Sequence, residues 1–344
     1  MQAHLVGSIA LPTVENVFST VGPMLGSYLR RIPDGEPGGR RVWVNWQYPV
    51  FLASPYLRLG DEADRANRGA RILRLRLADG VQPDDIRFGE LGYAREARAS
   101  YLDFCQARTK GEVPKGIRFQ VCLPTPINIV ATACAPDVVL QVEPAYEAAL
   151  RAEIDRLCSA IPHNDLCIQW DMVREVLWWD GRVLERQPAP FPTAEVRAQV
   201  LDRLARLSAA VPRDVELGFH LCYGDWGGRH QIEPADSGAM VNLSNAIAAQ
   251  NGKNLSYVHM PVPIARNDPA YFEPLRGLNL ASNTEVYLGL VHLQDGVAGA
   301  RSRIAAAAKF LHEFGVGTEC GLGRAKTSEM VVDILALYAA ICHL

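Results

Sequence analysis

The 344-residue sequence predicts a (β/α)8 barrel, the TIM-barrel form of the α/β class. Short apolar runs rich in Val, Ile and Phe alternate with longer stretches that have a helical period. This alternation repeats eight times, and no Ser/Gly-rich linker or low-complexity segment interrupts it. Such repetition is typical of a parallel sheet covered by helices. We therefore expect one barrel domain over residues 1–344, with an open doubly wound sheet as the alternative.

Eight apolar runs are the expected strands of the barrel. A short apolar run bounded by Gly, Pro or Asp is typical of a strand that is buried on both faces. The runs are His4–Ile9, Ile86–Glu90, Ile117–Cys122, Leu166–Trp170, Val215–His220, Leu255–Met260, Glu285–Leu290 and Val316–Glu319.

Three stretches between these runs show a clear helical period, namely residues 145–161, 193–211 and 299–315. Their apolar residues recur at intervals of three and four, which predicts amphipathic helices. Gly315 is expected to end the last of these helices.

Composition and charge narrow the classes of function. Hydrophobic residues make up 49% of the chain and charged residues 21%, which is typical of a globular protein. The formal net charge is -3 and no Lys/Arg run is interleaved with aromatic residues, so nucleic acid is not expected as a partner. Small molecules are the expected partners, and assembly into a homo-oligomer stays open.

The N-terminus reads MQAHLVGSIALP and has no basic segment followed by a long apolar run. No stretch reaches the roughly 18 to 20 apolar residues that span a bilayer. We therefore expect a cytoplasmic protein that has no membrane partner. The eight cysteines are scattered and are expected to be reduced; most fit small buried residues, whereas Cys222 and Cys320 lie at strand ends.

Polar residues gather where the expected strands end. In a barrel the reacting groups come from the carboxyl ends of the strands and from the loops after them. Nearly all the His, Cys and Asp residues that do not fit a core lie in these end segments, which read GSIALP, GELGY, CLPTP, QWDMVRE, HLCYGDW, HMPVP, VHLQDG and ECGLGR. The segments before the strands do not show this enrichment.

His220 and Cys222 are two residues apart at one strand end, so their side chains point the same way. Cys320 follows the last expected strand. Imidazole and thiolate together suit zinc, and a site with an exchangeable position suits catalysis. A buried pair of core residues explains His220 and Cys222 as well, so the pattern alone leaves the metal site open.

The strand ends resemble one known family in their order along most of the chain. HLVGSIALP resembles the family's Ile-Gly-Ser-Phe-Pro, IQWDMVRE its Gln-Ile-Asp-Glu-Pro-Ala-Leu-Arg-Glu, FHLCYGDW its His-Met-Cys-Tyr-Ser, and TECGLGR its Pro-Asp-Cys-Gly-Leu-Lys-Thr-Arg. The family is the catalytic barrel of cobalamin-independent methionine synthase, within the uroporphyrinogen-decarboxylase-like superfamily. The chain resembles a divergent member with a single barrel.

The resemblance implies a zinc ion, Zn²⁺, that activates a substrate thiol for alkylation. It implies His220, Cys222 and Cys320 as zinc ligands. The family's further ligand is a glutamate on the strand between them, which here reads LSYVHMPVP. His259 lies near that position and is expected as the fourth metal ligand, with a substrate-binding or core histidine as the alternative.

The resemblance also implies groups that act on the substrate. His292 matches a functional histidine that helps the leaving group, and Asp171 matches the aspartate that holds the amino group of homocysteine. Glu175, in the same segment, and Ser8, which matches a contact to the substrate carboxylate, are expected to bind substrate. The alternatives are a packed core histidine, an ion pair of Asp171 with Arg174, and a tight turn at Ser8.

The segment RRIPDGEPGGRRVWVNW is dense in charged and aromatic residues, and a rigid loop over a barrel mouth often carries specificity. Asp34, Glu36 and Arg41 are expected to bind a polar substrate and Trp43 to stack on it; a solvated loop is the alternative. Three residues after the metal motif are expected to line the same mouth, namely Tyr223, Asp225 and Trp226.

The chain departs from the family where Met172 and Val173 replace Glu-Pro, and where residues 293–295 replace Ser-Pro-Arg. The resemblance therefore does not extend to homocysteine or a polyglutamyl folate as substrates. The expected function is zinc-dependent methyl or alkyl transfer between an alkyl donor and a thiol, which makes the chain a transferase. A zinc lyase or hydrolase on the same barrel and a non-catalytic ligand-binding barrel are the alternatives.

Overall fold

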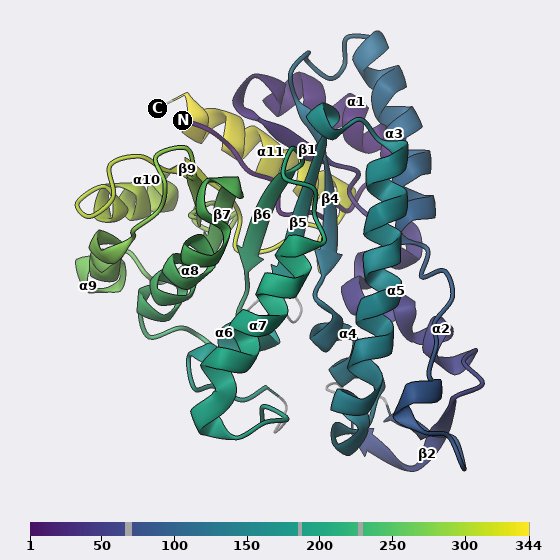
Figure 1. Ribbon diagram of the computed structural model, residues 1–344. Coiled ribbons are helices and arrows are strands. Elements are labelled where there is room, and N and C mark those ends of the chain that lie inside the picture. Colours follow the sequence, from purple (N-terminus) through teal and green to yellow (C-terminus); the bar gives the residue numbers. More distant parts are fainter. Residues whose placement is uncertain (66–70, 185–187, 226–229, 344) are drawn as a thin grey trace.

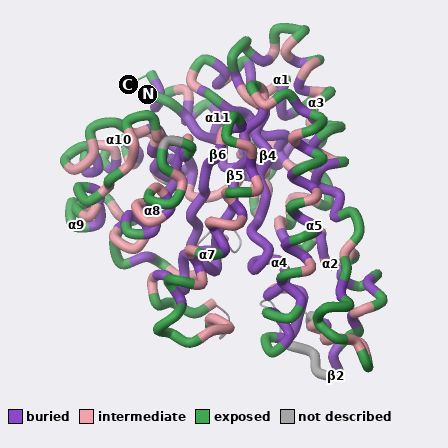
Figure 2. Tube along the Cα trace, in the orientation of Figure 1, coloured by how far each residue is buried: buried purple, intermediate pink, exposed green. Residues whose placement is uncertain are grey.

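Seven parallel strands lie at the centre of the molecule, and helices cover them on the outside (Figure 1). The computed structural model of the chain describes residues 1–65, 71–184, 188–225 and 230–343. The buried trace in Figure 2 follows the strands, whereas the exposed trace follows the outer faces of the helices and the loops. A sheet covered in this way needs apolar residues on both of its faces, as the sequence has.

The strands follow the order β1-β4-β5-β6-β7-β8-β9, and every neighbouring pair is parallel. Their bounds are β1 (Arg31–Pro33), β4 (Arg118–Pro124), β5 (Leu166–Met172), β6 (Glu216–Leu221), β7 (Leu255–Pro261), β8 (Glu285–Gly289) and β9 (Gly315–Val316). Six of the eight expected strands are thus present at or near their predicted places.

One buried arginine shows how strongly the sheet curls. Arg31 of the edge strand β1 is 4% exposed, and its guanidinium binds Glu216 of β6 and Glu285 of β8, the latter at 2.7 Å. These strands lie three and five places from β1 in the sheet order. In a flat sheet they would be about 14 Å and about 24 Å away, which no side chain spans. The predicted α/β class is therefore confirmed as a curled parallel sheet.

The N-terminal segment lies between the two edges of this sheet. Ala3 pairs in parallel with Leu29, just before β1, and with Val316 of β9. The amide of His4 donates to the carbonyl of Val316 at 2.8 Å. The expected strand His4–Ile9 is nevertheless wrong as a regular strand, because only isolated pairs form at Ala3 and Ile9.

The expected strand Ile86–Glu90 is also wrong. The place beside β4 is taken by β1, whose three residues are too short a run to show a period. Phe88 packs instead against Phe51 and Tyr146, with ring centroids 5.0 Å and 5.4 Å away. The apolar residues of residues 86–90 therefore serve the contact between helices rather than the sheet.

A hairpin outside the main sheet had no counterpart in the sequence prediction. Strands β2 (Leu57–Arg65) and β3 (Arg71–Leu77) pair antiparallel, and Leu75 bridges to Cys134. Figure 1 shows β2 at the lower end of the molecule, apart from the central strands.

The outer layer is made of helices that contact one another in turn around the sheet. Their bounds are α1 (Val14–Leu25), α2 (Tyr48–Leu52), α3 (Tyr93–Thr109), α4 (Pro126–Ala133), α5 (Val139–Ala160), α6 (Arg174–Trp179), α7 (Val196–Ala209), α8 (Gly238–Asn251), α9 (Pro269–Phe272), α10 (Gly296–Ala307) and α11 (Ser328–Cys342). Helix α11 packs on α1 and α10, so the two ends of the chain meet (Figure 1). Among the described helices none is both long and apolar enough to cross a membrane.

The three helices predicted from their period are present as α5, α7 and α10. The expected end of the last one at Gly315 is wrong, since α10 ends at Ala307 and Gly315 begins β9. A Cβ atom at Gly315 would lie 2.5 Å from the Tyr287 ring of the neighbouring strand. This glycine is therefore required by close strand packing and not by a helix end.

The pairing of Arg31 gives the first prediction. Arg31→Met should lower the free energy of unfolding by about 2 to 3 kcal/mol, because two carboxylates lose a shared buried partner. Arg30→Met is the matched control, since Arg30 also pairs with Glu285 at 2.7 Å but is 59% exposed. An exposed pair contributes at most about 1 kcal/mol. Urea unfolding followed by circular dichroism measures both variants, and equal losses would contradict the role of Arg31.

Candidate metal centre

Strand β6 places the two residues of the HLC motif. His220 pairs in register with Asp171 of β5 and with His259 of β7. The amide of Cys222 donates to the carbonyl of Met172 at 2.9 Å, which continues the pairing one step past the strand end. Because side chains alternate along a strand, His220 and Cys222 face the same side.

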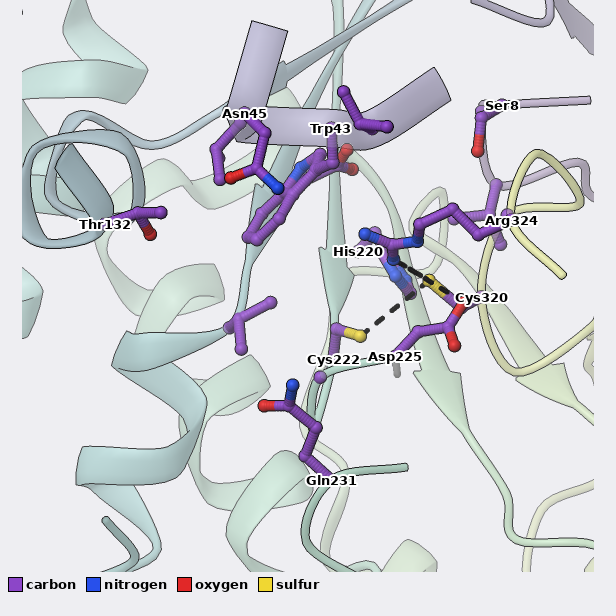
Figure 3. A pocket seen from close by; sticks show the side chains of 18 of the residues that line it. Ser8, Trp43, Asn45, Thr132, His220, Cys222, Asp225, Gln231, Cys320 and Arg324 are labelled. Carbon is purple, nitrogen blue, oxygen red and sulfur yellow. Dashed lines mark hydrogen bonds and ion pairs between the residues drawn. The ribbon is translucent and has the colours of Figure 1, made fainter. Parts of the chain in front are cut away.

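Cys320 completes a compact group with this pair. The nitrogen and sulfur ligand atoms of His220, Cys222 and Cys320 all lie within 4.8 Å of one another. The two sulfur atoms are 3.9 Å apart, as the dashed line in Figure 3 shows. Two thiolates that share a tetrahedral zinc at about 2.3 Å have their sulfur atoms about 3.8 Å apart. The spacing of the group therefore fits a zinc ion.

The ring of His220 is oriented with one nitrogen free. Its Nδ1 lies 2.8 Å from Nδ1 of His259. Its Nε2 is buried and has no hydrogen-bond partner among the described residues. A buried polar atom without a partner is costly, and a metal ion would satisfy it. His220 therefore fits a metal ligand through Nε2.

His259 does not join this group in the structure. It is fully buried behind His220, with its ring centroid 4.9 Å from that of His220. Burial, and then the neighbouring His220 and His4, lower the pKa of His259 well below its ordinary value. A neutral ring that contacts the other nitrogen of His220 can set the orientation of that ring.

The two cysteines of the group differ in their charge. The hydrogen bond from the Cys222 thiol, together with His220 and Arg324, lowers the pKa of Cys320 well below its ordinary value. The same bond and burial raise the pKa of Cys222. Cys320 is therefore the cysteine of the pair that gives up its proton more readily.

Arg324 lies beside this thiolate, and the sequence analysis missed it although it belongs to the ECGLGR segment. Its Nη2 is 3.9 Å from the sulfur of Cys320 and 3.5 Å from a carboxylate oxygen of Asp225 (Figure 3). The signal that could have found it is a cation four residues after Cys320, in the same segment at the carboxyl end of the sheet.

His220, Cys222 and Cys320 are called here the metal group. They form one wall of a cavity of about 120 Å³, called here the first cavity. Several of the expected substrate-binding residues line it together with Arg324, namely Ser8, Glu36, Trp43, Asp171 and Asp225. Figure 3 shows Trp43 and Ser8 facing the space in front of His220 and Cys320. Trp226 lies outside the described residues.

Two carboxyl groups distinguish the first cavity, that of the half-buried Glu36 and that of the buried Asp171. Burial, and then the nearby Asp34, raise the pKa of Glu36 to about 8. Burial, and then Glu36, raise the pKa of Asp171 well above its ordinary value. Gln169 Nε2 donates to Asp171 at 2.7 Å and so holds it in place. Two such groups favour a ligand that brings positive charge into the cavity.

Two expected substrate-binding residues of the charged loop do not line the first cavity. Asp34 accepts hydrogen bonds from Arg40 Nη1 at 2.8 Å and from Ser100 Oγ at 2.7 Å. Arg41 donates to the carbonyl of Leu11. Both side chains therefore hold the loop that carries Glu36 and Trp43.

Glu175 and Tyr223 are likewise turned away from the first cavity. Glu175 is fully buried and accepts from Thr125 and from Asn128 Nδ2, the latter at 2.8 Å. The hydroxyl of Tyr223 donates to Asp180 at 3.0 Å. Both residues serve packing contacts around α4 and α6, which their sequence neighbours could not reveal.

His292 lines a separate cavity of about 290 Å³, called here the second cavity. Its Nε2 lies 3.0 Å from the carbonyl of Val262, so Nε2 carries the ring proton. Its Nδ1 is 3.9 Å from Glu319. Burial, and then Arg303, lower the pKa of His292 to about 4. The ring is therefore neutral at pH 7 and can accept a hydrogen bond through Nδ1.

The solved structures that match this chain include one that is covered almost completely. It is a B12-independent methionine synthase from Shewanella sp. W3-18-1 in complex with selenomethionine, with a TM-score of 0.60 and 12% sequence identity. The match covers 99% of this chain and 97% of that chain. Neither the protein-family models nor the curated proteins give a match. The chain therefore shares the fold of this neighbour, which agrees with the resemblance of its strand-end motifs.

Proposed function

We propose that this chain is a zinc-dependent transferase that moves a methyl or other alkyl group onto the thiol of a small substrate. The observation that carries the proposal is the convergence of a buried, unpartnered His220 Nε2 with the sulfur atoms of Cys222 and Cys320 within 4.8 Å. The neighbour of the same fold is a methionine synthase, which supports this choice of chemistry.

We also infer that the N-terminal segment completes an eight-membered barrel. Ala3 pairs with residues at both edges of the curled sheet, which leaves no free edge between β1 and β9 at that level. Closure of this kind brings all the carboxyl strand ends to one rim.

His220, Cys222 and Cys320 would hold the zinc ion and leave one tetrahedral position for the substrate sulfur. When bound, zinc supplies a Lewis acid that lowers the pKa of a thiol in that position. We infer that His259 orients the ring of His220 and is not itself the fourth ligand. A histidine that accepts the Nδ1 proton of a ligand ring fixes its tautomer and its direction.

Glu36 and Asp171 would bind an amino group on the thiol substrate. An ammonium group between them restores the ionised form of both carboxyl groups, because an opposite charge favours the charged state. Ser8 lies on the same cavity wall and offers a hydroxyl. The substrate class that fits the first cavity is therefore a small amino thiol.

The reaction forms a bond between the substrate sulfur and the alkyl carbon while the bond from that carbon to its leaving group breaks. The electron pair of the broken bond goes to the leaving group. The proton of the thiol balances the charge of the leaving group. With a pKa of about 4, the ring of His292 is neutral at pH 7, so it offers a hydrogen-bond acceptor at Nδ1 and no proton for the leaving group. Holding both partners at one rim lowers the entropic part of the barrier.

Metal binding gives the second prediction. The wild-type chain should bind one zinc per molecule by mass spectrometry of the metal, and His220→Ala, Cys222→Ser and Cys320→Ser should each lose most of it. Cys122→Ser is the matched control, because the Cys122 thiol donates to the Val6 carbonyl and lies outside the group. Full zinc content in all three ligand variants would contradict the site.

The role of His259 gives the third prediction. His259→Phe should weaken zinc affinity by about 10- to 100-fold without abolishing binding, which is typical for loss of a residue that orients a ligand. X-ray absorption of the zinc-loaded wild type should show one nitrogen and two sulfur scatterers from the protein. Two nitrogen scatterers, with zinc lost completely in His259→Phe, would make His259 a ligand instead.

The substrate class gives the fourth prediction. Cysteamine added to the zinc form should bring a third sulfur scatterer at about 2.3 Å. Glu36→Gln and Asp171→Asn should each weaken cysteamine binding by roughly 10- to 100-fold, the effect of losing a hydrogen bond to a charged group. Binding of 2-mercaptoethanol, which has no amino group, is the control and should change little. Unchanged sulfur ligation with a newly bound oxygen atom would favour a lyase or hydrolase.

A further inference from the structure

We propose that the second cavity is a binding site for a small carboxylate with an apolar body, and that it receives the alkyl donor of the reaction. The inference rests on the proposed function for the donor role, whereas the binding site itself rests on the cavity alone. The residues that argue for it come from three segments at one rim, namely His230, Val291, His292, Glu319, Lys326 and Ile334.

The second cavity meets the first one at the metal group. Both cavities are lined by Asp225, Cys320 and Gly321. The first cavity has about 120 Å³ and the second about 290 Å³. The shared residues place the two cavities side by side, so one molecule can occupy each of them at the same time. The second cavity is the adjoining space from which another molecule can reach the side of Cys320.

His230 places a ring nitrogen at this site that donates a hydrogen bond when the ring is cationic. Its side chain is 1% exposed, and its Nδ1 lies 3.4 Å from Glu233 and 3.7 Å from Glu319. Its Nε2 is buried and has no partner within the described part of the chain. A buried imidazole nitrogen that lines a cavity and lacks a partner points to a ligand that supplies one.

Two basic side chains that line the second cavity, His230 and Lys326, are available to bind an anion, whereas its two carboxyl groups have partners of their own. Burial lowers the pKa of His230, but Glu233 and Glu319 raise it further than burial lowers it. The net rise favours the cationic form of the ring. Asp225 contacts Arg324 at 3.5 Å, and Glu319 faces the rings of His230 and His292. Lys326 has no ion pair with any residue that the structure describes. The lysine and the free nitrogen of His230 therefore remain as donors for a carboxylate.

The remaining wall is apolar. Val291 and Leu293 come from the loop after β8, Leu322 from the loop after β9, and Met330 and Ile334 from α11. These side chains would shed water on contact with a hydrocarbon group, at about 25 cal/mol per Å² of apolar surface buried. Pockets that combine an apolar wall with a few polar groups are typical of small-molecule sites.

The test uses hexanoate, hexylamine and 1-hexanol as probes of one length and three charges, with the zinc-loaded full chain. Isothermal titration should show hexanoate binding at least tenfold more tightly than the amine or the alcohol. Lys326→Met and His230→Gln should each weaken hexanoate binding by about tenfold, the effect of a lost charge-assisted hydrogen bond. Lys309→Met removes an exposed lysine outside the cavity and should change nothing.

Three outcomes would overturn the proposal. The first is equal affinity for the three probes, and the second is an equal effect of Lys326→Met and Lys309→Met on hexanoate binding. The third is displacement of hexanoate by cysteamine, because ligands of two separate cavities should bind at the same time. Met330→Trp, which fills the apolar part, should abolish hexanoate binding while zinc binding persists.

The same titration separates this inference from the proposed function. In Cys222→Ser, which should lose zinc, hexanoate should still bind with the wild-type affinity because its donors lie outside the metal group. A wild-type chain that binds hexanoate selectively but no zinc would end the proposed function and leave the carboxylate site standing. A chain that binds zinc and cysteamine but does not prefer hexanoate would end the carboxylate site and leave the proposed function standing.

Discussion

The curl of the parallel sheet is the constraint on which every other feature of this molecule depends. It is visible in Arg31, whose single guanidinium joins the first residues of β6 and β8 to the edge strand β1. These contacts lie at the amino ends of the strands. The metal group lies at the opposite ends, after β6 and β9. The molecule thus separates a charged structural contact at one end of the curled sheet from the candidate metal site at the other end.

A polar network inside the sheet connects these two ends. Gln169 donates to the carbonyl of Val6 at 2.6 Å and to Asp171 at 2.7 Å, and it accepts from the hydroxyl of Tyr257 at 2.9 Å. His4 adds a contact to the same amide at 3.0 Å. A buried network that is this fully bonded is rigid. It holds the N-terminal segment in place and sets the position of a carboxyl group in the first cavity.

The chemistry of the site follows from which atoms are left without partners. Nδ1 of His220 is used by His259, so only Nε2 is free to meet the two sulfur atoms. In the neighbouring second cavity, Nε2 of His230 is likewise buried and has no hydrogen-bond partner among the described residues. Both side chains line a cavity, where a bound ligand can supply the partner that the buried nitrogen lacks. Cys320 lies between the two places and lines both cavities.

The sequence by itself determined those features that depend on local period. The alternation along β6 turns His220 and Cys222 to one side, and the period of three and four produces α5 and α7. Tertiary structure alone decided that Cys320, 98 residues beyond Cys222, comes within 3.9 Å of it. It also decided that three residues, Arg31–Pro33, form the strand beside β4 in place of Ile86–Glu90. The spacing of apolar residues predicts which way a side chain points. Which residue that side chain contacts depends on chain segments that are far away in the sequence. For that reason His259 lies behind the candidate ligand His220 instead of beside it, and Glu175 is bonded to α4 instead of facing the first cavity.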